Sequence, residues 1–295
     1  MPKTSSTRNK AVARKPNEID IKPQRMGFEF GDQVPRYWAA NNYTLSHTMN
    51  ALSVLFPLGE QYFVDSVRHF RGQISDPELE KEIRGFIGQE AMHSLEHVAM
   101  NQHVRDQGIP VEALEQSLKV ILDLSRNLPK RHQLAITCGL EHLTAMMADV
   151  LLARDDLRND MDESMRPLWI WHAIEETEHK GVAFDVFQEV GGTYAERTFY
   201  LAFSTAMLGL VATAFTGRMM LNDRKNFTLK DSAQGLWRMW GRNGTFSSLI
   251  PAWLDYFRPD FHPWQHDNSD LIARFKDQVS VYITPEYRKD AKRRP

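Results

Sequence analysis

The strongest constraint on the fold is the pattern Glu-x-x-His, which occurs twice in segments with helical periodicity. One copy is Glu90 and His93 in "GFIGQEAMHSLEHV", and the other is Glu176 and His179 in "WIWHAIEETEHKGVAFD". A helix turns by about 100° per residue, so a residue and its i+3 neighbour share one face. Each pair can therefore bring a carboxylate and an imidazole to one metal ion or to a closely spaced pair of ions.

Each Glu-x-x-His segment follows a predicted helix that carries one candidate glutamate among apolar residues. Glu60 lies in "FPLGEQYFVDSVRHF", and Glu141 lies in "ITCGLEHLTAMM". A carboxylate buried without a partner costs several kcal/mol and tends to take up a proton, whereas a metal ion would offset that cost. The order Glu, Glu-x-x-His, Glu, Glu-x-x-His is the ligand set of the ferritin-like carboxylate bundles.

We therefore predict a dinuclear metal centre. Its predicted ligands are Glu60, Glu90, His93, Glu141, Glu176 and His179. Four carboxylates balance two divalent cations, and oxygen and imidazole ligands without thiolate suit iron, the favoured metal, with manganese and zinc as alternatives. His97 and His172 lie on the same helical faces and are candidates for an additional ligand or for partners that orient the ligands. The competing interpretation is a set of solvated helix faces and core histidines without metal.

Helical windows dominate the chain and few credible strands interrupt them, so the predicted fold class is all-α. Helices are expected over about 45–72, 75–108, 111–126, 129–154 and 161–192, with the first interrupted or restarted at Pro57. Helices of such length, connected by moderate loops, favour a bundle. Together with the ligand order above, this predicts a ferritin-like four-helix bundle with additional C-terminal helices.

Three parts are expected along the chain. Residues 1–25 form a basic N-terminal arm that is disordered or loosely docked, residues 26–225 form the bundle with the metal site, and residues 226–295 form a Trp-rich helical or irregular extension with a basic tail. Residues 198–217 contain no charged residue over twenty positions. That stretch could span a bilayer, but a fully buried bundle helix is the favoured interpretation.

Composition narrows the class of partner and the compartment. A formal net charge of -2 gives no reason to expect nucleic acid as a partner. The single cysteine, Cys138, excludes an intrachain disulfide framework and a thiolate zinc site. We expect a cytoplasmic protein with a small-molecule substrate. Peripheral or single-helix membrane association and a homodimer stay open as alternatives.

Four segments resemble a known family. They are "FPLGEQYFVDSVRHF", "IGQEAMHSLEH", "LEHLTA" and "WIWHAIEETEHKGVAFDVF", and together they resemble the family named "predicted metal-dependent hydrolase", a branch of the ferritin-like superfamily. The resemblance covers roughly residues 25–270. It implies metal ligands at the six residues given above and hydrolysis by a metal-activated water. Ligand sets of this kind in the wider superfamily more often serve dioxygen chemistry.

Two enzymatic functions therefore compete. The first is O2-dependent oxidation or oxygenation of a small lipophilic substrate at a di-iron centre, with Glu60, Glu90, Glu141 and Glu176 as the carboxylates of the reacting site. The second is metal-dependent hydrolysis, and no Gly-x-Ser-x-Gly motif competes with a metal-based mechanism. Metal storage or a structural metal is a third, non-enzymatic alternative. An enzyme is predicted, with oxidation favoured by the site chemistry and hydrolysis by the resemblance.

Overall fold

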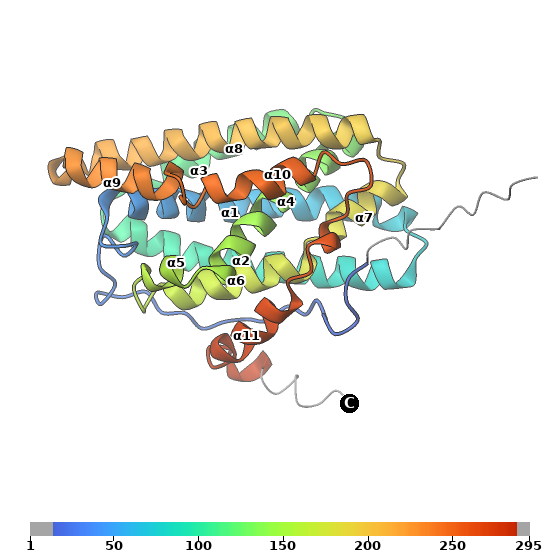
Figure 1. Ribbon diagram of the computed structural model, residues 1–295, viewed down its shortest axis with the longest axis horizontal. Helices are drawn as coiled ribbons and strands as arrows, with labels where there is room; N and C mark the ends of the chain where they lie inside the picture. The colour runs from blue at the N-terminus through green and yellow to red at the C-terminus, as the bar shows by residue number, and fades with distance from the viewer. Residues whose placement is uncertain (1–13, 288–295) are drawn as a thin grey trace, which may run out of the picture.

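The structure, a computed structural model, describes residues 14–287, and it is all-α as predicted (Figure 1). Its long helices are α1 (Tyr43–Phe70), α2 (Pro77–Asp106), α3 (Val111–Ser125), α4 (Lys130–Ala153) and α8 (Tyr194–Asn222). Its shorter helices are α5 (Asp155–Asn159), α6 (Arg166–His179), α7 (Val182–Glu189), α9 (Leu229–Trp240), α10 (Ile250–Asp255) and α11 (Ser269–Ser280). Short 3-10 turns lie at Arg71–Gln73, Arg224–Asn226, Ser247–Leu249 and Pro263–Gln265. A four-helix bundle of the ferritin-like type stays a prediction.

The long helices run side by side along the long axis of the molecule (Figure 1). Helix α1 packs along α2 and α8, and α4 packs against α6 and α8. Helix α8 follows one edge of the molecule together with α9 and α10, while α11 lies at the opposite edge against α6 (Figure 1). The helices that carry the predicted ligands, α1, α2, α4 and α6, therefore surround the interior of the molecule.

Polar caps fix where the first two ligand-bearing helices begin. The Asn42 side chain accepts a hydrogen bond from the backbone N–H of Leu45 at the start of α1. At the start of α2, Asp76 accepts from the N–H of Glu78, and Pro77 occupies the first helical turn, where its missing N–H costs nothing. These caps set the register that aims Glu60 and Glu90 inward.

Helix α1 continues through Pro57, so the expected interruption does not occur. Proline has no N–H, which leaves the carbonyl of Ser53, four residues earlier, without its helical donor. The side-chain amide of Asn101 on α2 donates to that carbonyl at 3.2 Å. The neighbouring helix thus replaces the lost hydrogen bond and keeps Glu60 on an unbroken helix.

The helix expected over 161–192 is instead divided into α6 and α7 at Lys180 and Gly181. A Cβ atom at Gly181 would lie 2.8 Å from Nε1 of Trp264, so only glycine leaves room for this buried indole. The Trp-rich extension therefore packs directly beyond the end of α6, two residues after His179. The predicted division into 26–225 and 226–295 stays a prediction.

The segment before α1 runs along the bundle and crosses α2. Ile19 and Ile21 are buried, and the backbone of Ile21 lies so close to Gly85 that a Cβ there would collide with its carbonyl oxygen. Gly88 makes similar room for the ring of Pro23. Residues 1–13 of the predicted N-terminal arm lie outside the described residues.

Two helices, α4 and α8, are long and apolar enough to cross a membrane, and their burial differs sharply. The most apolar stretch of α4 is 72% buried inside the protein, whereas that of α8 is 28% buried. The expectation of a fully buried helix over 198–217 is therefore wrong. Length and composition give only a weak hint of membrane association, and a cytoplasmic location stays a prediction.

Candidate metal centre

Seven buried acidic and histidine side chains converge between α1, α2, α4 and α6. The first group is Glu60, His93, His172 and Glu176, and the second group is Glu90, Glu141 and His179. Within each group the candidate ligand atoms lie within 4.8 Å of one another. All six residues predicted as ligands belong to these groups. Their roles as ligands stay predictions, but the structure brings them together as a two-ion site requires.

The Glu176 carboxylate connects the two groups. Its Oε1 lies 3.6 Å from Nδ1 of His93 and 3.2 Å from Nε2 of His172 in the first group. The same oxygen lies 3.7 Å from Nε2 of His179 in the second group, where that nitrogen is also 3.2 Å from Oε1 of Glu90. This position between the groups is the one that a bridging carboxylate would occupy.

His179 is anchored from behind by a chain of polar side chains. Its Nδ1 lies 3.0 Å from Oε1 of Gln89, and the Gln89 amide donates to Glu178 at 2.8 Å. Lys276 of α11 donates to the other oxygen of Glu178 at 2.6 Å. Because an amide oxygen only accepts, Nδ1 carries the proton and Nε2 is left free to face the carboxylates. Outer hydrogen bonds of this kind orient histidine ligands in metal sites.

His172 is held in the same way by His97. Nε2 of His97 lies 2.8 Å from Nδ1 of His172, and Nδ1 of His97 lies 2.9 Å from the hydroxyl of Ser53. One nitrogen of His97 is thus engaged with His172 and the other with Ser53, while Nε2 of His172 faces Glu176. Of the two histidines considered as additional ligands, His172 joins a group and His97 supports it.

His93 faces the centre through Nδ1, whereas His172 and His179 face it through Nε2. Nδ1 points to the acidic groups, with Oε1 of Glu60 at 3.8 Å, and Nε2 lies 3.3 Å from Oε2 of Glu175. The indole N–H of Trp171 donates to the other oxygen of Glu175 at 2.9 Å. His172 and His179 therefore each have one nitrogen directed inward and one hydrogen-bonded to an outer partner, whereas the outer nitrogen of His93 only lies beside Glu175.

Several inward atoms have no hydrogen-bond partner within residues 14–287. They include both carboxylate oxygens of Glu90 and Glu141, one oxygen each of Glu60 and Glu176, and one inward nitrogen on each of His93, His172 and His179. A buried polar atom without a partner costs about 1–3 kcal/mol. Oxygen and imidazole donors that converge in this way fit divalent metal ions, and the four carboxylates would balance the charge of two such ions.

Electrostatics support the same conclusion. Burial, with neighbouring carboxylates, raises the pKa values of Glu60, Glu90 and Glu141 well above their usual range. Burial acts in the same direction on Glu176, but the adjacent imidazoles of His172 and His179 outweigh it and hold the pKa of Glu176 well below its usual range. Burial lowers the pKa of His179, but the neighbouring carboxylates, chiefly that of Glu176, raise it to about 9. Without cations, protons neutralise this cluster, so metal binding would release them.

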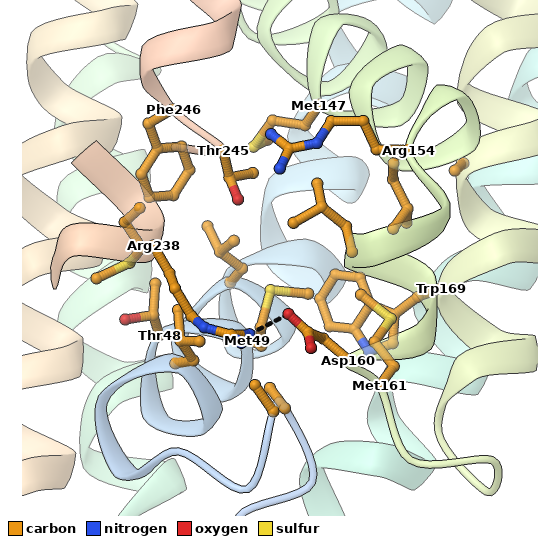
Figure 2. Close-up of a pocket in the computed structure, with 18 of the residues that line it drawn as sticks. Thr48, Met49, Met147, Arg154, Asp160, Met161, Trp169, Arg238, Thr245 and Phe246 are labelled. Atoms are coloured by element: carbon orange, nitrogen blue, oxygen red, sulfur yellow. Dashed lines mark hydrogen bonds and ion pairs between the residues drawn. The ribbon is translucent and has the colours of Figure 1, made fainter. Parts of the chain in front are cut away.

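A cavity of ≈ 400 Å³, here called cavity one, extends from exposed residues to the first group (Figure 2). His172 and Glu176 line its buried part, and the walls are mainly apolar, with Met49, Met147 and Trp169 among them. An ion pair between Arg238 of α9 and Asp160 crosses it (Figure 2). The lining offers an apolar substrate a route to Glu176, a predicted ligand, and to His172.

A second, smaller cavity of ≈ 140 Å³, cavity two, reaches Glu60 from another direction. Its lining is almost wholly apolar. Leu52, Phe56, Thr144 and Met147 line both cavities and form a shared wall between them. The candidate centre is thus approached by two separate apolar spaces.

The comparison with protein families decides the class of protein. The family model described as "Predicted metal-dependent hydrolase" matches residues 22–267, which covers most of the chain. The chain belongs to this family. It has no significant match among curated proteins or among solved structures. Membership indicates a metal-dependent enzyme, and the histidine and glutamate groups fit the divalent metals that such an enzyme needs. Placement in the ferritin-like superfamily stays a prediction.

Some residues of the site were not found from the sequence. Gln89 restrains His179, and the hydroxyl of Ser94 donates to Oε2 of Glu60 at 2.9 Å. Gln89 and Ser94 are direct chain neighbours of Glu90 and His93, so helical spacing places them about 100° away from those ligands. Which of them turns toward the site depends on the packing of the other helices, and no signal in one sequence reveals it.

Proposed function

We propose that the protein is a hydrolase that acts at a dinuclear metal centre on a small substrate with a largely apolar body. The two ions would be held by the side chains of the two groups, with Glu176 between them. The observation that carries the proposal is that cavity one ends at His172 and Glu176. A substrate held by the apolar walls would place its reacting bond beside the centre.

When bound, two divalent cations would lower the pKa of a water molecule and polarise the bond to be cleaved. The chain's own residues have three tasks in such a reaction. Gln89 and His97 orient His179 and His172 by contacts to their outer nitrogens, and Glu175 lies beside the outer nitrogen of His93. The apolar lining of cavity one binds the body of the substrate and excludes bulk water. Glu176, whose pKa is lowered, stays ionised between the two groups.

O2-dependent oxidation is the second candidate, and a specific feature favours it. Cavity two is almost wholly apolar and reaches Glu60, which suits a small apolar gas better than a polar reactant. The carboxylate and imidazole donors, without thiolate, also suit iron. The family description favours hydrolysis instead.

Metal loading followed by two assays separates these candidates. Metal-free protein is loaded with Zn(II) or Mn(II), or anaerobically with Fe(II), and the ions bound per chain are counted. Hydrolysis of a panel of apolar esters, amides and phosphoesters by the Zn(II) or Mn(II) form would support the first candidate. Dioxygen uptake and a new near-ultraviolet or visible band in the Fe(II) form would support the second. Binding of two ions without either activity would overturn both in favour of a structural or storage metal.

A matched pair of variants links any activity to the site. Glu176→Gln removes the carboxylate charge between the groups and should abolish turnover together with binding of at least one ion. Thr245→Trp fills cavity one, where the Thr245 side chain projects into the opening (Figure 2). It should reduce turnover of bulky substrates while both ions remain bound. Full activity in both variants would place the reaction elsewhere.

A further inference from the structure

Helices α8, α9 and α10 present an exposed apolar face that the metal centre does not use. We call it the α8–α10 surface. Its exposed large apolar residues are Phe199, Phe203, Leu210 and Leu221 on α8, Leu229, Leu236, Trp237 and Trp240 on α9, and Ile250 and Leu254 on α10. At 100° per residue, the four on α8 fall within about 40° around its axis. They form a stripe along α8, and α8, α9 and α10 follow one edge of the molecule (Figure 1).

The charges around this surface are strongly one-sided. Residues 198–250 contain six basic and two acidic residues, although the whole chain has a net charge of -2. Both acidic residues are engaged: Asp223 accepts from Arg36 and Tyr37, and Asp231 accepts from the N–H of Tyr43. Five exposed basic residues have no ion-pair partner within residues 14–287, and they are Arg218, Arg224, Lys225, Lys230 and Arg242. The surface thus combines apolar side chains with uncompensated positive charge.

That combination fits an anionic lipid bilayer better than a second copy of the chain. A two-fold dimer through this face would put two copies of the basic segment into one interface, where the surface offers no unengaged acidic residue to pair with them. A bilayer that contains anionic lipids attracts the basic residues, and exposed tryptophans such as Trp237 and Trp240 favour the membrane–water interface. Helix α8 also packs along α4 and α1, so one of its faces is already occupied by protein.

We propose that the α8–α10 surface docks on an anionic lipid bilayer and that the substrate enters cavity one from that bilayer as an amphiphilic lipid. The proposed docking is supported by the α8–α10 surface alone, whereas the substrate class rests on the proposed function. Trp237, which is 70% exposed, belongs to the docking surface and also lines cavity one. Arg238 and Phe246 line the same part of the cavity (Figure 2). The mouth of cavity one therefore adjoins the surface that would meet the lipid.

Vesicle co-sedimentation of the full chain tests the docking. Vesicles of phosphatidylcholine alone are compared with vesicles that also contain phosphatidylglycerol. We expect binding to the mixed vesicles that weakens as salt screens the charges. Phe199→Ser with Leu210→Ser, and separately Lys225→Glu with Lys230→Glu, should each weaken binding about tenfold. Leu95→Ser with Val98→Ser on α2 is the matched control, because these residues are 49% and 51% exposed but lie outside the surface, and it should bind like the wild type.

Four results would overturn the docking. The first is no binding to either kind of vesicle, and the second is binding at the wild-type level by both surface variants. The third is a dimer in sedimentation analysis that the Phe199→Ser, Leu210→Ser pair dissociates. The fourth is retention of the protein in the membrane after alkaline extraction, which would show a spanning helix. Bound metal is measured in every variant. Because none of the substituted residues contacts the centre, unchanged metal content separates a failure of docking from a failure of the metal site.

A kinetic comparison tests the route of entry. If the lipid enters from the bilayer, the Phe199→Ser, Leu210→Ser pair should raise the apparent KM for a substrate embedded in vesicles about tenfold. Its kcat/KM for a short, water-soluble analogue should stay at the wild-type value. Equal losses for both substrates, or no loss for either, would contradict entry from the bilayer while leaving the metal-dependent activity intact.

Discussion

Replacement of Glu141 by leucine should reverse the order of stability between metal-free and metal-bound protein. Glu141 is 1% exposed, and neither of its oxygens has a hydrogen-bond partner within the described chain. Leucine has a similar size and no polar atoms. In metal-free protein the substitution removes a buried unpaired carboxyl, which should stabilise the fold by about 1–3 kcal/mol.

The metal-bound comparison should have the opposite sign. A ligand that binds only the folded state adds about 4.1 kcal/mol when its free concentration is one thousand times its Kd. At about 2–4 °C per kcal/mol for a chain near this size, the wild-type Tm should rise by about 8–16 °C. Glu141→Leu loses a predicted ligand of the second group, so its Tm should respond much less. The variant is therefore more stable without metal and less stable with it.

Calorimetric unfolding with and without Zn(II) or Mn(II), together with metal counting, measures both effects. Glu96→Leu is the matched control, since Glu96 is also buried and lies on ligand helix α2 but belongs to neither group. Its Tm should respond to metal like the wild type. If Glu141→Leu keeps the full increase in Tm with metal and binds two ions, Glu141 is not a ligand. If the metal-free variant is destabilised by about 2–5 kcal/mol, as core substitutions that leave a cavity are, the buried carboxyl of Glu141 does not destabilise the metal-free protein.

Three further predictions concern residues outside the two groups of the candidate metal centre. His97→Ala should keep both ions but weaken their affinity about 10–100-fold in competition with a chelator, because His97 only orients His172; complete loss of an ion would make it a ligand. Burial raises the pKa of Asp223, but hydrogen bonds, chiefly from an arginine and a tyrosine, outweigh this and hold it at about 2. Asp223→Asn should thus have a lower free energy of unfolding than the wild type, by an amount that is constant above the ordinary pKa of 3.8 and vanishes as the pH falls through about 2. Urea unfolding that shows a constant difference down to pH 2 would contradict this. Gly181→Ala should destabilise the protein by about 1–3 kcal/mol in urea, because its Cβ would press on Trp264, whereas Gly209→Ala, with open space around it, should not.

The candidate site was largely predictable because its signal is local. Glu90 with His93 and Glu176 with His179 each lie within one helical turn, and apolar neighbours mark Glu60 and Glu141 as buried. The choice between His97 and His172 was not predictable. Both share the azimuth of the ligands, and only the axial offset between α2 and α6, set by packing of the whole protein, decides which of them faces Glu176.

The fold was predictable in class but not in its interruptions. Proline at position 57 normally ends or kinks a helix, and the donor that compensates it, Asn101, lies on another helix. The end of α6 depends on Trp264, far along the chain, which needs the space beside Gly181. The exposed stripe of α8 was missed because an apolar helix of that length has a similar sequence whether it lies in a core, on a surface or in a membrane.

The spread of the seven convergent side chains over four helices sets an order of events during biosynthesis. The earliest in the chain is Glu60 and the last is His179, so the complete set exists only after all four helices have been synthesised and packed. The chain would therefore reach its native topology first, with protons on the carboxyls of Glu60, Glu90 and Glu141. Ions would arrive afterwards through an assembled protein, which makes the rate of metallation a property of the finished fold and its cavities, independent of the rate of folding.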